Sequence, residues 1–234
     1  MKLRKLTISD YFLIIVNLIP VYGVWFEGWN AAQIFLVFCL ETVIIGVFNI
    51  VKMACVTLFV KPKDVWNSEG TITKVSGLFF IIFFTVHYGF FVFIQTQIFF
   101  SVSGILENKS FFSSYRDIPR ALGSDGQLVL LIFIVYYTLQ TFYDFFLSGE
   151  YKTISMGKLM FQPYGRIFIQ QFVVIAGAVF IAMGLNTIFI MILVFVKLGF
   201  DLFINFDDFL NKAELKEKEK MNMLEKTNTD QLKS

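Results

Sequence analysis

Residues 31–58 read AAQIFLVFCLETVIIGVFNIVKMACVTL, a run of 28 residues in which only Glu41 and Lys52 are charged. An α-helix rises about 1.5 Å per residue, so this run would form a helix roughly 42 Å long. The hydrocarbon core of a bilayer is about 30 Å thick. The run therefore predicts a transmembrane helix that tilts or projects beyond one membrane surface.

Five further apolar runs flank this stretch, and 56% of the chain is hydrophobic while only 16% is charged. Soluble domains carry about 25% charged residues, so the composition favours a membrane protein. The last two runs are separated by Leu185 and Asn186, which predicts a tight helical hairpin. We expect an all-α transmembrane bundle of about six helices over residues 1–206, followed by a charged tail at 207–234 that is a short helix or disordered. The expected spans are 10–26, 31–58, 75–101, 127–147, 166–184 and 187–206.

The positions of Lys and Arg predict the orientation of the bundle. Fifteen of them fall on the side of the N-terminus, whereas only Lys109, Arg116 and Arg120 fall in the opposite loop at 102–126. Cytoplasmic loops are enriched in Lys and Arg, so both termini are expected in the cytoplasm. The expected partner is the lipid bilayer. Nucleic acid is not expected, because the net charge is only +2 and there is no basic stripe.

Polar side chains recur on one helical face of most of the expected spans. A charged side chain in a bilayer costs at least about 2.5–3.5 kcal/mol, so each one requires a partner or a wet cavity. Glu41 and His87 would lie near the midplane. A second group would lie in the cytoplasmic half, next to the loop residues Glu150 and Tyr151: Asn49, Lys52, Asp144, Arg166 and Asp201. We therefore predict a polar cavity open to the cytoplasm, with Glu41 and His87 at its floor. The candidate lining residues are Glu41, Asn49, Lys52, His87, Tyr88, Asp144, Glu150, Tyr151, Arg166, Gln171, Lys197 and Asp201.

A second interpretation makes the same side chains hydrogen-bonding contacts that lock helices together, each contributing about 0.6 kcal/mol. In this interpretation Lys197 and Asp201 form an ion pair within one helix, because they are four residues apart. No metal site is expected, because a zinc ion takes three or four ligands and His87 is the single histidine. No cofactor is predicted.

Four short motifs follow one another through the apolar part of the chain. They are Glu41-x3-Ile45-Gly46-x2-Asn49-x2-Lys52-Met53, His87-Tyr88-Gly89, Gly149-Glu150-Tyr151 leading to Pro163-Tyr164-Gly165-Arg166-Ile167, and Lys197-x3-Asp201. Together they resemble the pattern of a family of bacterial polytopic inner-membrane proteins of unknown function. The resemblance implies an inner-membrane location and supplies no activity.

The chain departs from this family pattern at Gln95, Gln171 and Asn205, where the family tends to have histidine. Several imidazoles on the inner face would imply metal, haem or proton chemistry. Glutamine and asparagine form hydrogen bonds but do not take up a proton near neutral pH and ligate transition metals poorly. A metal-dependent mechanism is therefore in doubt for this chain.

Three classes of function are left open. The favoured one is a small transporter or channel-like protein, the default interpretation of ionisable residues inside a membrane, although the chain has no inverted repeat. The second is a structural or assembly subunit of a membrane complex. The third is a membrane-embedded enzyme acting on a lipid or quinone, with Glu41 or Glu150 as base and His87 as acid. A homo-oligomer is also left open.

Overall fold

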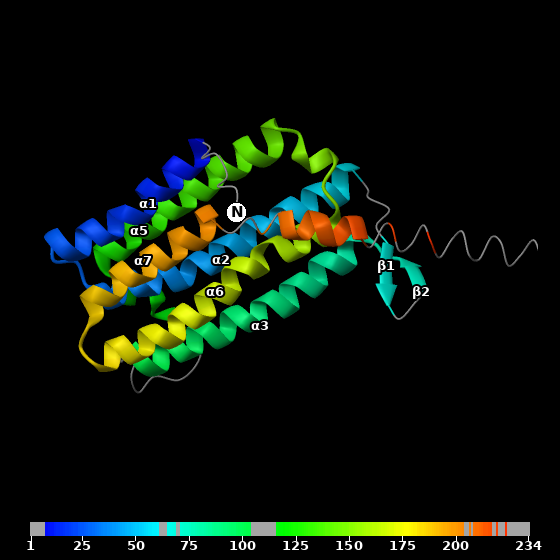
Figure 1. The fold of residues 1–234 in the computed structure, drawn as a ribbon. Coiled ribbons are helices and arrows are strands. Elements are labelled where there is room, and N and C mark those ends of the chain that lie inside the picture. The colour runs from blue at the N-terminus through cyan, green and yellow to red at the C-terminus, as the bar shows by residue number, and fades with distance from the viewer. Residues whose placement is uncertain are drawn as a thin grey trace, which may run out of the picture.

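The computed structural model describes residues 8–60, 65–68, 71–103, 116–203, 206, 208–216, 219 and 223. The described part is a helical bundle with one short β-hairpin, β1–β2, beyond one end (Figure 1). Helix α2 continues into the short π-helix η1, and α5 continues into the π-helix η2, which the 3-10 turn η3 follows. The elements are α1 (Ile8–Phe26), α2 (Ala31–Cys55), η1 (Val56–Val60), β1 (Val65–Ser68), β2 (Thr71–Lys74), α3 (Gly77–Ser103), α5 (Ile118–Gln140), η2 (Thr141–Leu147), η3 (Glu150–Lys152), α6 (Met156–Ala182) and α7 (Asn186–Phe203).

Helix α2 is the central helix of the bundle. It packs against α5, α3, α6 and α7, and Figure 1 shows it running between the other helices. Its residues from Ile34 to Cys39 are at most 2% exposed. An apolar stretch of this kind suits a position in which protein covers the helix on all sides. The side chain of Asn30 begins α2 by accepting hydrogen bonds from the backbone N–H groups of Ala32 and Gln33.

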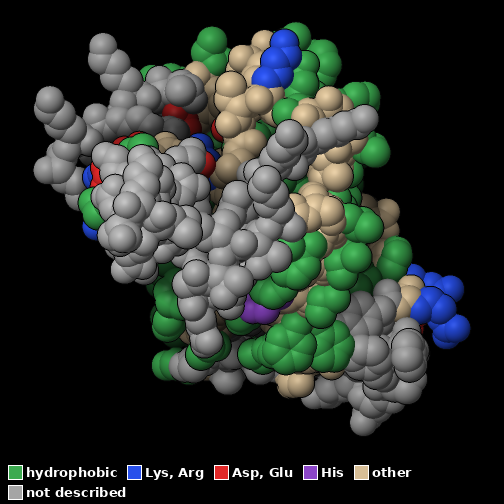
Figure 2. Space-filling model, turned by 90° about the vertical axis from the view of Figure 1, so that its right-hand side faces the viewer, with side chains coloured by type: hydrophobic (Ala, Val, Ile, Leu, Met, Phe, Trp, Pro, Cys, Tyr) green, Lys and Arg blue, Asp and Glu red, His purple; other side chains and the backbone are tan. Residues whose placement is uncertain are grey.

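Four helical segments of the described residues are long and apolar enough to cross a membrane: Ile8–Phe26, Ala31–Val60, Gly77–Ser101 and Ile118–Leu147. They coincide with the first four expected spans, so the prediction of a helical, membrane-associated chain is confirmed at this level. Hydrophobic side chains such as Val47, Val86, Leu131 and Phe195 point outward and are exposed. Figure 2 shows hydrophobic side chains over the described flanks of one end, with Lys and Arg at its edges. Outward apolar side chains fit contact with lipid.

The expected helical hairpin near Leu185 is present between α6 and α7. Gly184 adopts a left-handed conformation (φ 73°), and the N–H of Leu185 donates to the carbonyl of Phe180 at 2.9 Å. This arrangement is the common glycine-terminated end of a helix. The chain therefore reverses where the sequence predicted it.

Two helix boundaries differ from the prediction. Helix α6 begins at Met156 rather than near residue 166, because the Ser155 hydroxyl accepts a hydrogen bond from the N–H of Lys158 at 3.1 Å and starts the helix early. Helix α5 begins at Ile118, inside the expected outer loop, with a proline in its first turn. Gly123 (φ 63°) kinks it before the long segment that corresponds to the expected span.

The hairpin β1–β2 was not predicted. Its strands pair antiparallel, with Val65 opposite Lys74 and Ser68 opposite Thr71. Of the expected charged tail, residues 208–216 are helical, and most of its other residues lie outside the described ones. Asn205 also lies outside them.

Candidate functional site

A polar cavity of about 380 Å³ lies at one end of the bundle. Its walls come from the start of α1, the end of α2, the junction of α5 with η2, the first half of α6 and the end of α7. These segments meet because helices that follow one another in the chain run in opposite directions. The cavity therefore lies at the end of the bundle where the described chain begins.

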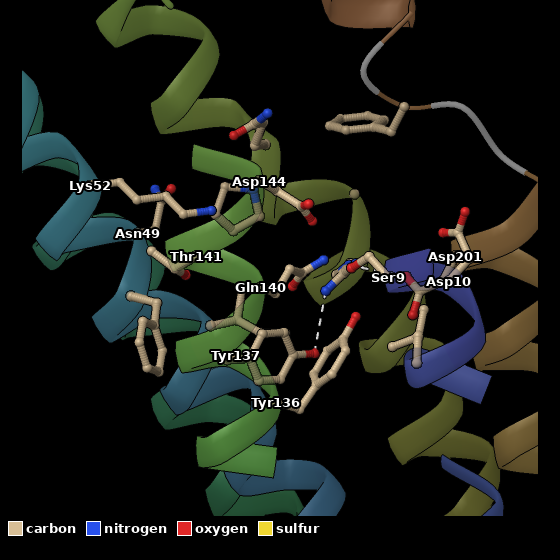
Figure 3. Close-up of a pocket in the computed structure, with 18 of the residues that line it drawn as sticks. Ser9, Asp10, Asn49, Lys52, Tyr136, Tyr137, Gln140, Thr141, Asp144 and Asp201 are labelled. Atoms are coloured by element: carbon tan, nitrogen blue, oxygen red, sulfur yellow. Dashed lines mark hydrogen bonds and ion pairs between the residues drawn. The ribbon is translucent and has the colours of Figure 1, made fainter. Parts of the chain in front are cut away.

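Charged side chains line the cavity from six elements: α1, α2, η2, η3, α6 and α7. Figure 3 shows Asp10 and Asp201 together on one side, Asn49 and Lys52 on the other, and Tyr136 below. Carboxylates outnumber basic groups by four to two. The charged lining residues are Asp10, Lys52, Asp144, Glu150, Arg166 and Asp201.

Arg166 links three helices at the base of this cavity. Its Nε atom lies 3.0 Å from Oδ1 of Asp201, whose side chain is only 3% exposed. Its Nη1 atom donates to the Tyr137 hydroxyl at 3.3 Å, the contact dashed in Figure 3. A planar guanidinium with several donors is suited to binding two partners at once. Arg166 thereby connects α6 with both α5 and α7.

Beneath Arg166 the polar contacts continue to the buried carboxylate of Glu41. The Tyr137 hydroxyl donates to Glu41 Oε1 at 2.6 Å. Lys197 Nζ lies 2.6 Å from Oε1 and 2.5 Å from Oε2 of the same carboxylate, and 2.6 Å from Oδ1 of Asn17. We call this set the ion-pair network: Asn17, Glu41, Tyr137, Arg166, Lys197 and Asp201.

The ion-pair network holds two positive and two negative charges, so it is neutral overall. Glu41 is fully buried, and its charge is balanced directly by Lys197. The Lys197 ammonium also lies 5.2 Å from the ring centroid of Phe38 and 4.9 Å from that of Phe133. Rings at these distances attract a cation. A buried charge is tolerated only with partners of this kind.

Aromatic rings fill the bundle on the far side of Glu41. The ring centroid of Phe35 lies 5.2 Å from that of Phe99 and 5.0 Å from that of Phe189. The ring centroids of Phe38 and Phe133 are 5.7 Å apart. All five rings are at most 2% exposed. We call these five residues the aromatic plug, because they pack between the ion-pair network and the opposite end.

A family model described as a family of unknown function, DUF6498, matches residues 1–225. The chain belongs to DUF6498. The match includes every helix of the bundle and the whole ion-pair network, and it confirms the resemblance to a family of unknown function. No curated protein and no solved structure matches the chain.

In this DUF6498 protein six of the sequence-predicted residues line the cavity: Asn49, Lys52, Asp144, Glu150, Arg166 and Asp201. Asn49 also donates to the Leu159 carbonyl at 2.9 Å and so joins α2 to α6. Lys52 Nζ lies 5.4 Å from the ring centroid of Phe145. Glu41 and Lys197 lie deeper, in the ion-pair network.

The predicted ion pair between Lys197 and Asp201 within α7 is wrong. Lys197 pairs with Glu41 of α2, and Asp201 pairs with Arg166 of α6. Spacing along one helix permits the intrahelical pair, but facing helices offer each side chain a buried partner of opposite charge. Each pair therefore connects two helices.

The structure does not bring His87 to the cavity. His87 is exposed on α3, where its Nδ1 lies 2.7 Å from the Tyr164 hydroxyl and its ring stacks on Phe83. Among the described residues, none of α3 lines the cavity. The buried row of α3 is Phe80, Phe84 and Tyr88, so His87 is turned outward beside it.

Three other predicted residues pack helices together. The Tyr88 hydroxyl donates to the Thr42 carbonyl at 2.9 Å, and a Cβ atom on Gly46 would lie 2.6 Å from Cε1 of Tyr88. Only glycine therefore lets α2 and α3 approach so closely.

The Gln171 side-chain amide donates to the Phe91 carbonyl at 3.2 Å and to Gln95 Oε1 at 3.4 Å. Two of the positions at which the family pattern has histidine therefore face each other. Tyr151 packs beside Phe145 and Phe146. Among the described residues no group of three or more His, Cys, Asp or Glu could hold a metal ion.

Sequence reasoning missed four residues of the site: Asp10, Asn17, Tyr136 and Tyr137. Helical spacing in the sequence could have indicated three of the four. Asp10 and Asn17 are seven residues apart and share one face of α1, and Tyr137 shares a face of α5 with Gln140 and Asp144.

Proposed function

We propose that the protein is a six-span membrane transport protein whose solute-binding cavity opens to the cytoplasm of a bacterial cell. In this proposal α6 and α7 are the fifth and sixth spans. Their 27 and 18 residues give helices about 40 and 27 Å long. Fifteen basic residues against three support cytoplasmic termini and, with them, a cavity that opens to the cytoplasm.

The observation that carries the proposal is the cavity of about 380 Å³ that ends on the ion-pair network. Its size is in the range of small-molecule pockets, about 300–1,000 Å³. Interhelical contacts alone would support an assembly subunit, but they require no cavity lined by six charged side chains. Charged residues along a cavity inside a membrane favour a path for a solute or ion.

The arrangement on the two sides of Glu41 supports transport rather than a fixed pore. A polar cavity lies on one side, and the aromatic plug packs on the other. This is the arrangement expected of a transporter in its cytoplasm-open state. Outward opening would require the plug to separate. The ion-pair network includes residues of α1, α2, α5, α6 and α7. A change in its ion pairs would therefore link closing of the cavity to separation of the aromatic plug.

Cys39 provides a test that requires no knowledge of the solute. It is 1% exposed and lies in the buried stretch of α2 beyond Glu41. With Cys55 replaced by Ser, Cys39 is the single thiol of the chain. A transporter that alternates should show slow reaction of Cys39 with a membrane-impermeant thiol reagent added from outside the cell. Glu41→Gln should change the rate, because it removes the charge that holds Lys197.

A cysteine-free protein, Cys39→Ser with Cys55→Ser, gives the background of this experiment. If Cys39 stays unreactive from outside while the cavity is labelled from the cytoplasm, the cavity is static. That result would favour the assembly subunit. The third hypothesis, a membrane-embedded enzyme, is not favoured. Its proposed acid, His87, lies outside the cavity that holds its proposed base, Glu150.

A further inference from the structure

The carboxylate of Asp201 uses only one of its two oxygens. Oδ1 pairs with Arg166 at 3.0 Å, whereas Oδ2 is buried without a hydrogen-bond partner in the described part of the chain. Leaving a buried acceptor unpaired costs about 1–3 kcal/mol, and more when it is charged. Asp201 lines the cavity, so Oδ2 can accept a donor from a bound molecule.

Tyr136 presents a second unpaired group to the same cavity. Its side chain is 6% exposed, and its hydroxyl forms no close hydrogen bond within the described residues, with the Ser9 side chain lying beside it. The adjacent Tyr137 hydroxyl, by contrast, is occupied by Glu41 and Arg166. Figure 3 shows the Tyr136 hydroxyl directed toward the side of the cavity that carries Ser9, Asp10 and Asp201.

The charge of the cavity indicates the sign of the ligand. Among the described lining residues, four carboxylates and two basic groups give a charge of −2, and Arg166 already pairs with Asp201. A negative lining with an unpaired carboxylate oxygen favours a cation that carries hydrogen-bond donors. The rings of Phe48, Tyr136 and Tyr137 also line the cavity and suit a cation.

We propose that the cavity binds a small organic ammonium ion whose N–H groups donate to Asp201 Oδ2 and to the Tyr136 hydroxyl. This inference rests on the proposed function and adds the class of solute to it. An N–H donor is required at both atoms. A quaternary ammonium ion of the same charge should therefore bind much more weakly, and an anion should not bind.

The experiment uses the full chain in lipid nanodiscs and radiolabelled methylammonium as the probe. We expect saturable binding that unlabelled methylammonium displaces, with tetramethylammonium at least tenfold weaker as a competitor and acetate without effect. Tyr136→Phe should weaken methylammonium binding about tenfold, the loss expected for about 1.4 kcal/mol. It should change thermal unfolding little, because the hydroxyl forms no close hydrogen bond within the described residues.

Tyr143→Phe is the matched control, since Tyr143 is exposed and is not among the described lining residues. It should bind methylammonium as the unaltered protein does. Asp201→Asn should abolish binding, and Tyr136→Phe keeps the test decisive if Asp201→Asn does not fold. Equal competition by tetramethylammonium would overturn the proposal, and so would unchanged affinity in Tyr136→Phe.

The outcomes also separate this inference from the proposed function. If methylammonium does not bind but Cys39 still reacts from outside, the ammonium subsite is wrong and transport stands. If methylammonium binds and Cys39 does not react, the subsite stands in a protein that does not transport. If neither is observed, both proposals fail.

Discussion

Lys197 of α7 forms an ion pair with Glu41 of α2, with Nζ 2.6 Å from Oε1 and 2.5 Å from Oε2 of the carboxylate. The carboxylate is fully buried and the lysine side chain is 14% exposed. Removing one member of a buried pair leaves the other charge without compensation, which is more damaging than removing both. The pair therefore holds α2 against α7, and the stability of the fold depends on both of its members.

We predict that Glu41→Leu or Lys197→Met alone destabilises the protein by about 3–5 kcal/mol, because each leaves an unpaired buried charge. The double variant should lose much less than the sum of the two. Thermal unfolding in detergent gives the comparison as a double-mutant cycle. Additive losses would show that the two side chains do not act as a pair.

Arg166→Lys should weaken the junction of α5, α6 and α7. A lysine cannot reach Asp201 and Tyr137 together with the geometry of the guanidinium. We expect a loss of about 1.5–3 kcal/mol, the usual range for a hydrogen bond to a charged group. Arg120→Lys is the control, because the Arg120 side chain is 91% exposed and its ion pair with Asp117 is long, at 3.9 Å. Equal unfolding temperatures of the two variants would contradict the role of Arg166.

Gly46→Ala should separate α2 from α3, because its Cβ would lie 2.6 Å from the ring of Tyr88. Overpacking of this kind costs about 1–3 kcal/mol. Gly89→Ala, on α3, is the matched control, since no described atom lies within 4 Å of its Cβ position. Unfolding of the two variants side by side tests the contact. A Gly46→Ala protein as stable as Gly89→Ala would show that α2 and α3 do not meet there.

Four helices long and apolar enough to cross a membrane, and the hairpin near Leu185, could be predicted from the sequence. The length of an apolar run indicates a helix that can cross a membrane. The direction in which each helix runs then indicates the end of the bundle at which a given residue lies. Asn49, Asp144 and Asp201 come from three different elements and line one cavity at one end of the bundle.

The pairing of side chains could not be predicted in the same way. A helical repeat shows which residues share a face but not which neighbour that face meets. The spacing of Lys197 and Asp201 suggested a pair within α7, whereas packing turned each toward a different helix. His87 was misplaced for the same reason, because the row of Phe80, Phe84 and Tyr88 fixes the rotation of α3.

His87→Phe tests the position of His87 on the outer face of α3, away from the cavity. It keeps an aromatic ring against Phe83 and removes the contact with the Tyr164 hydroxyl. We expect a stability change below about 1.5 kcal/mol, as for one hydrogen bond. Methylammonium binding should be unchanged, because His87 lies outside the cavity. A large loss of binding would return His87 to the site.

The most direct measurement of the central claim is the sidedness of thiol labelling at Gln140→Cys, made in a chain with Cys39 and Cys55 replaced by Ser. Gln140 lines the cavity, whereas the adjacent Leu139 is half exposed on the outer surface of the bundle and provides the control position. A polar, membrane-impermeant reagent should modify Gln140→Cys in inside-out vesicles and not in intact cells, and should leave Leu139→Cys unmodified in both. An unreactive Gln140→Cys, or one that reacts only from outside the cell, would contradict a polar cavity open to the cytoplasm.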